Sequence, residues 1–199
     1  MCGLCGFAIT WPMSDPFFFG YGSLVNRATH DFPRAMPARV TGWARKWKRT
    51  KLRQVAFLTA VEADGVEIDG LIAAVPNADW TALDEREHAY HRLPVTRITH
   101  GLGGLPDVQI YRTRPENDTD ASTDYPILLS YLDTVVQGYL REFGEAGANA
   151  FFATTSGWDT HVLDDRAVPI YPRAQALTGP ERDFVDDRLA ALGVARRRA

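Results

Sequence analysis

The stretch Phe17-Phe18-Phe19-Gly20-Tyr21-Gly22-Ser23-Leu24 joins an aromatic run to a turn that contains two glycines. Large aromatic residues favour a β-strand, and glycines on both sides of a tyrosine let the backbone bend and approach another group closely. In such a turn, the amides of Ser23 and Leu24 can point into a concavity and bind a carboxylate or an oxyanion. The third glycine and the helix of a dinucleotide-binding fingerprint are missing. We therefore interpret residues 17–24 as a strand followed by a candidate binding turn.

Working outward from this turn, predicted strands dominate the first half of the chain and predicted helices the second. Further strands are predicted over 38–48, 54–61, 66–75, 90–99 and 108–112, and Asp64-Gly65 predicts a hairpin between the second and third of these. Helices are predicted over 80–88, 126–143 and 178–192, and the apolar residues of the middle helix repeat at helical spacing and form one broad face. We expect Asp124 to cap the middle helix, Gly144 to end it, and Thr178 and Glu181 to form a capping box. Because the elements do not alternate regularly, the pattern favours an α+β domain, a small mixed β-barrel with helices packed outside.

The composition is that of an ordinary globular protein: 199 residues, 45% apolar and 24% charged. A net charge of −3 provides no basic field for nucleic acid, and no apolar run approaches the ~20 residues that span a bilayer. We expect a cytoplasmic monomer or weak homodimer that binds a small molecule and neither nucleic acid nor membrane.

We expect a single domain over residues 13–199 and a loose tail over residues 1–12, with Arg196–Arg198 as a solvated end. Cys2 and Cys5 show a C-x-x-C spacing, but no second cysteine pair completes a zinc site. His88 and His91 do not complete a metal site either, because the helix is predicted to end between them. No metal or organic cofactor is expected.

Glu87 is the most informative charged residue. On a helix of ~3.6 residues per turn, it falls within the stripe formed by Trp80, Leu83 and Tyr90. A carboxylate that faces inward is costly unless it is paired, and burial raises its pKa toward the range useful to a general base. A structural role remains open, in which Glu87 pairs with Arg92 or Arg45.

The turn at 21–24, followed about sixty residues later by Leu83-Asp84-Glu85-Arg86-Glu87, resembles the gamma-glutamylcyclotransferase superfamily, especially its bacterial branch related to the glutathione-degrading enzymes. The segment Ser130–Val135 is similar to a family helix that places a tyrosine at the pocket. The resemblance implies that Glu87 is the catalytic acid/base. It also implies that Gly22, Ser23 and Leu24 hold the glutamyl end of the substrate, with Tyr21 and Tyr131 as further binding residues.

The implied reaction is cyclisation of a γ-glutamyl peptide or amine to 5-oxoproline, with glutathione among the candidate substrates. Two alternatives stay open: a binding module that retains a ligand without turnover, and an amide hydrolase that releases glutamate. The segment from Trp158 to Arg173 receives no role from the sequence.

Overall fold

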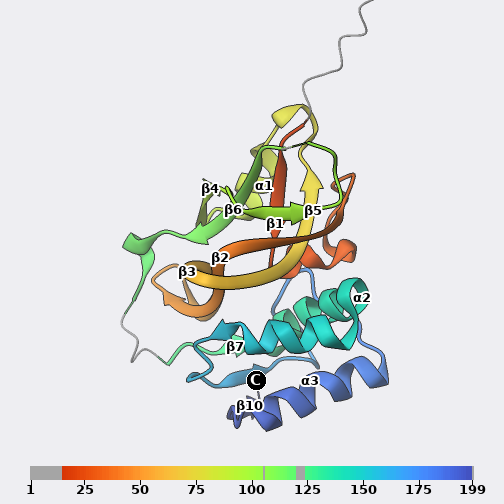
Figure 1. Cartoon of the computed structure of the whole chain (residues 1–199). Helices are drawn as coiled ribbons and strands as arrows, with labels where there is room; N and C mark the ends of the chain where they lie inside the picture. The colour runs from red at the N-terminus through yellow and green to blue at the C-terminus, as the bar shows by residue number, and fades with distance from the viewer. Residues whose placement is uncertain (1–14, 105, 120–123, 199) are drawn as a thin grey trace, which may run out of the picture.

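A mixed seven-stranded sheet is the largest element of the computed structural model, which describes residues 15–104, 106–119 and 124–198 (Figure 1). Its spatial order is β4-β6-β1-β3-β2-β5, with β8 paired to β2. The strands are β1 Phe17–Gly20, β2 Met36–Thr50, β3 Arg53–Ala74, β4 Tyr90–Pro94, β5 Ile98–His100, β6 Val108–Thr113 and β8 Thr155–Ser156. The expected tail over 1–12, with Cys2 and Cys5, lies outside the described residues.

The aromatic run becomes β1, whose four residues are all buried. This strand is antiparallel to β3 and parallel to β6, so it lies inside the sheet. The α+β class is therefore confirmed. The closed barrel is wrong, because β4 and β5 end the sheet and do not pair with each other.

Strands β2 and β3 form one long hairpin, from the pair Met36 and Ile72 to the pair Thr50 and Arg53. The predicted hairpin between 54–61 and 66–75 is wrong, because both segments belong to β3. The chain reverses instead at Lys51 and Leu52, between the two strands.

The Asp64-Gly65 signal marks an irregularity within the hairpin. Thr41 pairs with Glu67 and Trp43 with Glu62, so four residues of β3 face one residue of β2, Gly42. Gly42 and Gly65 have φ of 91° and 75°. Glycine adopts such angles without steric cost in a bulge as well as in a turn, which is why the local signal was misread.

Helix α2, Leu129–Ala153, packs between the large sheet and α3, Gly179–Ala191 (Figure 1). Its predicted apolar face is confirmed, with Leu132, Val135 and Tyr139 fully buried. It begins at Leu129 without a side-chain cap at its N-cap residue, so the predicted cap by Asp124 is wrong. Gly144 ends the first part of α2, as predicted, because its φ of 63° and ψ of −169° are not helical. A second helical part follows this kink and runs to Ala153.

A small parallel sheet covers the far side of α2 and contains β7 Ile127–Leu128, β9 Val162–Asp164 and β10 Arg196–Arg198. The residues expected to form a solvated end, Arg196–Arg198, are exposed and form strand β10. Arg196 forms ion pairs with Asp164 and Asp186. The capping box of α3 is confirmed: Thr178 and Glu181 each accept from the other's backbone N–H.

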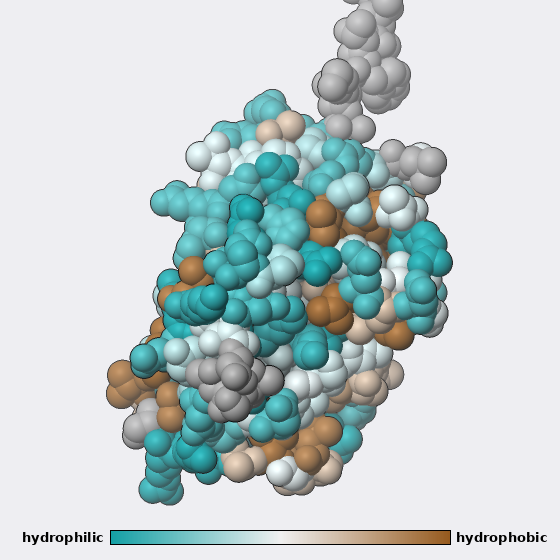
Figure 2. All heavy atoms as spheres, turned by 90° about the vertical axis from the view of Figure 1, so that its left-hand side faces the viewer, coloured by the Kyte–Doolittle hydropathy of each residue, from teal (hydrophilic) through white to brown (hydrophobic). Residues whose placement is uncertain are grey.

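Hydrophilic residues cover most of the face drawn in Figure 2, and hydrophobic atoms appear there in small separate groups. Among the described residues, no helix combines the length and the apolar character needed to cross a membrane.

Candidate active site

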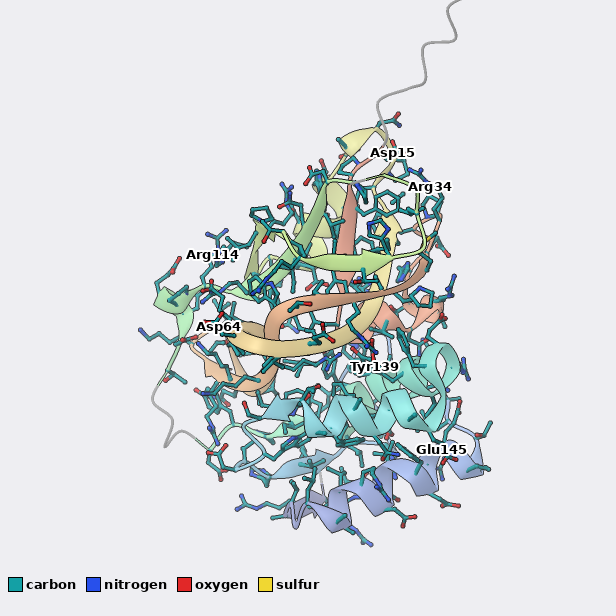
Figure 3. All side chains as sticks on the ribbon, in the orientation of Figure 1. Asp15, Arg34, Asp64, Arg114, Tyr139 and Glu145 are labelled. Carbon is teal, nitrogen blue, oxygen red and sulfur yellow. The ribbon has the colours of Figure 1, made fainter. Side chains whose placement is uncertain are left out.

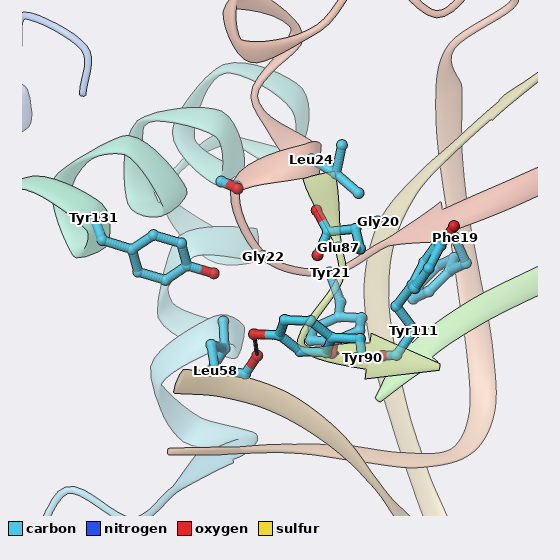
Figure 4. A pocket seen from close by; sticks show the side chains of 11 residues that line it. Phe19, Gly20, Tyr21, Gly22, Leu24, Leu58, Glu87, Tyr90, Tyr111 and Tyr131 are labelled. Atoms are coloured by element: carbon cyan, nitrogen blue, oxygen red, sulfur yellow. Dashed lines mark hydrogen bonds between the residues drawn. The ribbon is translucent and has the colours of Figure 1, made fainter. Parts of the chain in front are cut away.

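A cavity lies where the turn after β1, the end of α1 (Thr81–Arg86) and the start of α2 meet (Figure 4). It contains all six residues that the sequence analysis singled out. The residues that line it are Phe19, Gly20, Tyr21, Gly22, Ser23, Leu24, Leu58, Glu87, Tyr90, Tyr111 and Tyr131.

The turn itself is tight and is fixed to α2. Residues Ser23–Val25 form one 3-10 turn, in which the Val25 N–H donates to the Gly22 carbonyl at 2.9 Å. The Asn26 side chain then donates to the Thr134 carbonyl and to Gln137 on α2, at 2.9 and 3.0 Å. Because Asn26 directly follows the turn, these bonds fix the turn against the helix that carries Tyr131.

A buried arginine holds the turn from behind. Arg45, only 1% exposed, donates to the Tyr21 carbonyl at 3.3 Å and to the Tyr139 hydroxyl at 2.5 Å. Tyr139 extends from α2 toward the sheet (Figure 3), and its hydroxyl lies 2.9 Å from the same Tyr21 carbonyl and 2.8 Å from the Asp69 carbonyl, between which its one proton is shared. Arg45 therefore positions the turn, and the expected pairing of Arg45 with Glu87 is wrong.

Glu87 reaches the cavity from the residue after α1. The helix was predicted to continue to His88, but it ends at Arg86, and Glu87 has φ −99° and ψ 28°. The Glu87 N–H still donates to the Leu83 carbonyl at 2.9 Å, and Leu83 is buried. The final helical hydrogen bond thus keeps Glu87 near the inward direction that the helical spacing predicted.

The partner of Glu87 is its own neighbour, Arg86, at 3.3 Å between Nε and Oε1. Arg86 also donates to the Thr29 carbonyl at 2.8 Å and to the Ser23 hydroxyl at 3.2 Å, so it connects the carboxylate to the turn. The other expected partner, Arg92, pairs instead with Asp84 at 2.9 Å. The sequence analysis assigned no role to Arg86. Its position within the Leu83–Glu87 motif was the available signal.

Burial raises the pKa of the Glu87 carboxyl, whose side chain is 16% exposed. The positive charges of Arg86, Arg173 and His88 act against this shift, in that order of size. A carboxyl with a raised pKa that still has a cation beside it is suited to accept and return a proton.

The tyrosines of the cavity differ in how their hydroxyls are used. Tyr21 donates to the Tyr111 carbonyl at 2.6 Å, Tyr90 to the Leu58 carbonyl at 3.0 Å, and Tyr111 to Asp84 at 2.5 Å. Among the described residues, the Tyr131 hydroxyl donates to no acceptor. Figure 4 shows Tyr131 directed from α2 toward Gly22. Burial raises the pKa of Tyr131 well above its usual value, so its hydroxyl stays protonated and can donate.

The cavity adjoins a second pocket, which shares Ser23, Leu58, Glu87, Tyr90 and Tyr131 with it. We call the two parts the inner cavity and the outer pocket. The further residues of the outer pocket are Arg53, Val55, Ala56, Phe57, Arg86, His88, Ala89, Leu128, Tyr171, Pro172 and Arg173. The C-terminal segment from Trp158 to Arg173, for which no role could be predicted, therefore contributes Tyr171, Pro172 and Arg173 to the wall of this pocket.

No group of three or more potential metal ligands occurs among the described residues. The Ser23 hydroxyl accepts a hydrogen bond from Arg86. Among the described residues, no histidine forms a hydrogen bond with this hydroxyl. This geometry does not activate Ser23 as a nucleophile.

Comparison with protein families gives a match over residues 18–130 to the family described as gamma-glutamyl cyclotransferase, AIG2-like. The chain belongs to this family. The matched region contains most of β1, the turn and Glu87. It includes every residue that lines the inner cavity except Tyr131.

Solved structures support the same fold at low sequence identity. A gamma-glutamyl cyclotransferase is 16% identical, with a TM-score of 0.56 over 87% of this chain and 99% of that one. An uncharacterized protein from Homo sapiens gives the same values. YkqA from Bacillus subtilis is 18% identical, with a TM-score of 0.54 over 72% of this chain and 56% of that one. Comparison with curated protein sequences found no significant match.

Proposed function

We propose that the protein is a gamma-glutamylcyclotransferase that converts a γ-glutamyl peptide or amine to 5-oxoproline and a free amine. The observation that carries this proposal is that Glu87 and the turn Gly22–Leu24 line one cavity (Figure 4). Family membership supports the reaction class, and the geometry supports the assignment of roles.

In the proposed reaction, the α-amino nitrogen of the glutamyl group attacks its own δ-carbonyl carbon. An ammonium group has no lone pair, so Glu87 first accepts a proton from it. The new C–N bond closes the five-membered ring, and the bond to the departing nitrogen then breaks. Glu87 returns this proton to the departing nitrogen, which leaves as a neutral amine. Glu87 then takes the second proton that the ring nitrogen loses and passes it to solvent, which restores the carboxylate.

Much of the rate advantage comes from holding a flexible chain in a curled conformation. The nucleophile and the carbonyl belong to one molecule, so the cavity has only to fix their geometry. The turn amides at Gly22, Ser23 and Leu24 bind the glutamyl end or the oxyanion, and Tyr131 donates a further hydrogen bond. Tyr21 serves as a wall, because its hydroxyl is already bonded to Tyr111.

Incubation with a panel that includes glutathione, γ-glutamyl dipeptides and γ-glutamyl amines tests the proposal, with 5-oxoproline measured by mass spectrometry. At least one member should yield 5-oxoproline. Release of glutamate in its place would identify a hydrolase, and saturable binding without turnover would identify a binding module. Either result would contradict the proposal.

A further inference from the structure

The outer pocket carries an excess of positive charge that the proposed reaction does not use. Arg53, Arg86, Arg173 and His88 line it, and Glu87 is its single acidic side chain. Arg86 is already committed to Glu87, Thr29 and Ser23. Among the described residues, the guanidinium groups of Arg53 and Arg173 form neither an ion pair nor a hydrogen bond. Two cations at a pocket rim thus remain available to a ligand.

From this arrangement, and resting on the proposed function, we infer that Arg53 and Arg173 bind a carboxylate on the departing amine. The preferred substrates are then γ-glutamyl amino acids or short γ-glutamyl peptides, whose leaving group is an anion, and not γ-glutamyl amines without a carboxylate.

The wall that carries Arg173 is held in place by a buried carboxylate. Asp165, 1% exposed, accepts from the Ser130 N–H at 2.8 Å, from the Ser130 hydroxyl at 2.6 Å and from the Ile170 N–H at 2.8 Å. Tyr171 then packs edge-on against Tyr131, with 5.0 Å between ring centroids. These contacts fix residues 170–171 against the start of α2. The position of Arg173 two residues later is therefore set by the fold.

The two parts of the cavity suit different halves of the substrate. The inner cavity is lined by aromatic rings and by the turn, and it contains no cationic side chain. We place the glutamyl group there, because this part contains the turn residues Gly22 and Leu24 together with Glu87, which has to meet the reacting nitrogen. The departing group then extends past Leu58 into the outer pocket, between the apolar wall of Val55 and Phe57 and the two arginines.

Charge near Glu87 is consistent with this placement. Arg173 is close enough for its charge to lower the pKa of the Glu87 carboxyl. A carboxylate that approaches Arg173 would therefore also lie within reach of the catalytic region. Guanidinium groups bind carboxylates through charge-assisted hydrogen bonds that can be bidentate, which favours an amino-acid carboxylate over a neutral amide.

A pair of matched substrates tests the inference: γ-glutamylalanine and γ-glutamylalaninamide, which differ in a carboxylate against a carboxamide. Release of 5-oxoproline gives kcat/KM for each. In the double variant Arg53→Gln/Arg173→Gln, we expect a loss of about tenfold for the acid, the value of one charge-assisted hydrogen bond, and little change for the amide. Comparison between variants cancels the intrinsic difference in reactivity of the two substrates.

Lys51→Gln is the matched control, because Lys51 is exposed, lies two residues from Arg53 and does not line either part of the cavity. It removes one positive charge, half of what the double variant loses, without removing a residue that lines the pocket, and it should leave the ratio of the two kcat/KM values unchanged. Thermal unfolding of all variants shows whether each is folded.

Three results would overturn the inference. An equal loss on both substrates would assign the arginines to the glutamyl half. No loss on either substrate in the double variant, or a ratio that falls as far in Lys51→Gln, would rule out the specific carboxylate contact. In each of these results the wild-type protein still produces 5-oxoproline, so the proposed function stands. Absence of 5-oxoproline from every γ-glutamyl compound would instead overturn the proposed function and this inference together.

Discussion

The Tyr131 hydroxyl lies beside Gly22 at the point where a side chain on residue 22 would begin. A Cβ atom built on Gly22 would be 2.7 Å from that oxygen, well inside contact distance. Residue 22 is thus a glycine because a tyrosine from α2 enters the space beside it. This relationship, and the carboxylate that faces the same turn, lead to four predictions.

Gly22→Ala should reduce kcat/KM by about 10²-fold, because the added methyl group displaces the Tyr131 hydroxyl and small misplacements in an active site are costly. Stability should change little, since the displaced atom is the end of a side chain. Steady-state kinetics and thermal unfolding measure the two effects. In a Tyr131→Phe background, which removes the clashing oxygen, Gly22→Ala should reduce kcat/KM by a smaller factor. Additive losses in the double variant would show that the two residues act independently.

Glu87→Gln should lower the rate by at least about 10²-fold, the contribution of a positioned acid/base. It should not lower the unfolding temperature at neutral pH. Burial raises the pKa of Glu87 in the folded protein above its value in the unfolded chain. The stability that Glu87 contributes is therefore fully present below its unfolded-state pKa. It is lost as the pH rises through its folded-state pKa. Unfolding curves at several pH values should therefore show wild type losing stability relative to the variant as pH increases. Inactivity accompanied by unfolding would identify a structural carboxylate.

Arg86→Gln should move the acid limb of the kcat/KM profile to higher pH. Burial raises the pKa of Glu87, and the positive charge of Arg86 partly offsets this effect by favouring the carboxylate. When the guanidinium is removed, the pKa of Glu87 therefore rises further. Arg92→Gln is the matched control, because Arg92 pairs with Asp84 and not with Glu87. A limb that moves equally in both variants would show that Arg86 has no specific effect.

Tyr139→Phe should destabilise the protein by about 1–3 kcal/mol, since it removes bonds to the Tyr21 and Asp69 carbonyls and leaves Arg45 short of an acceptor. Burial raises the pKa of Tyr139 to about 12, so its hydroxyl is protonated throughout the working pH range. Urea unfolding gives the change in free energy. A loss below about 0.5 kcal/mol would mean that the buried arginine finds another partner.

Short sequence patterns correctly predicted those elements that are determined by neighbouring residues in the chain. The aromatic run gave β1, the helical spacing gave the buried face of α2, and Thr178 with Glu181 gave the start of α3. The motif around Glu87 identified the inner cavity, and the structure brings all six candidate residues to it. Their roles stay proposals.

The failures share a physical cause, which is that tertiary pairing decides between local alternatives. Gly65 fits a turn or a bulge equally well, and the partner strand β2 selects the bulge. Arg45 and Arg173 carry no motif, because their roles depend on residues that are distant in sequence.

The cavity combines segments that lie far apart along the chain, since Tyr21 and Tyr171 are 150 positions apart. Bringing such segments together costs loop-closure entropy, which the packing of the C-terminal segment against α2 has to offset. A fragment that stopped at residue 130, where the family match ends, would keep the turn and Glu87 but lose Tyr131, Asp165 and Arg173. Evolution of new substrate preferences can therefore act on the C-terminal segment while the residues of the turn and Glu87 stay unchanged.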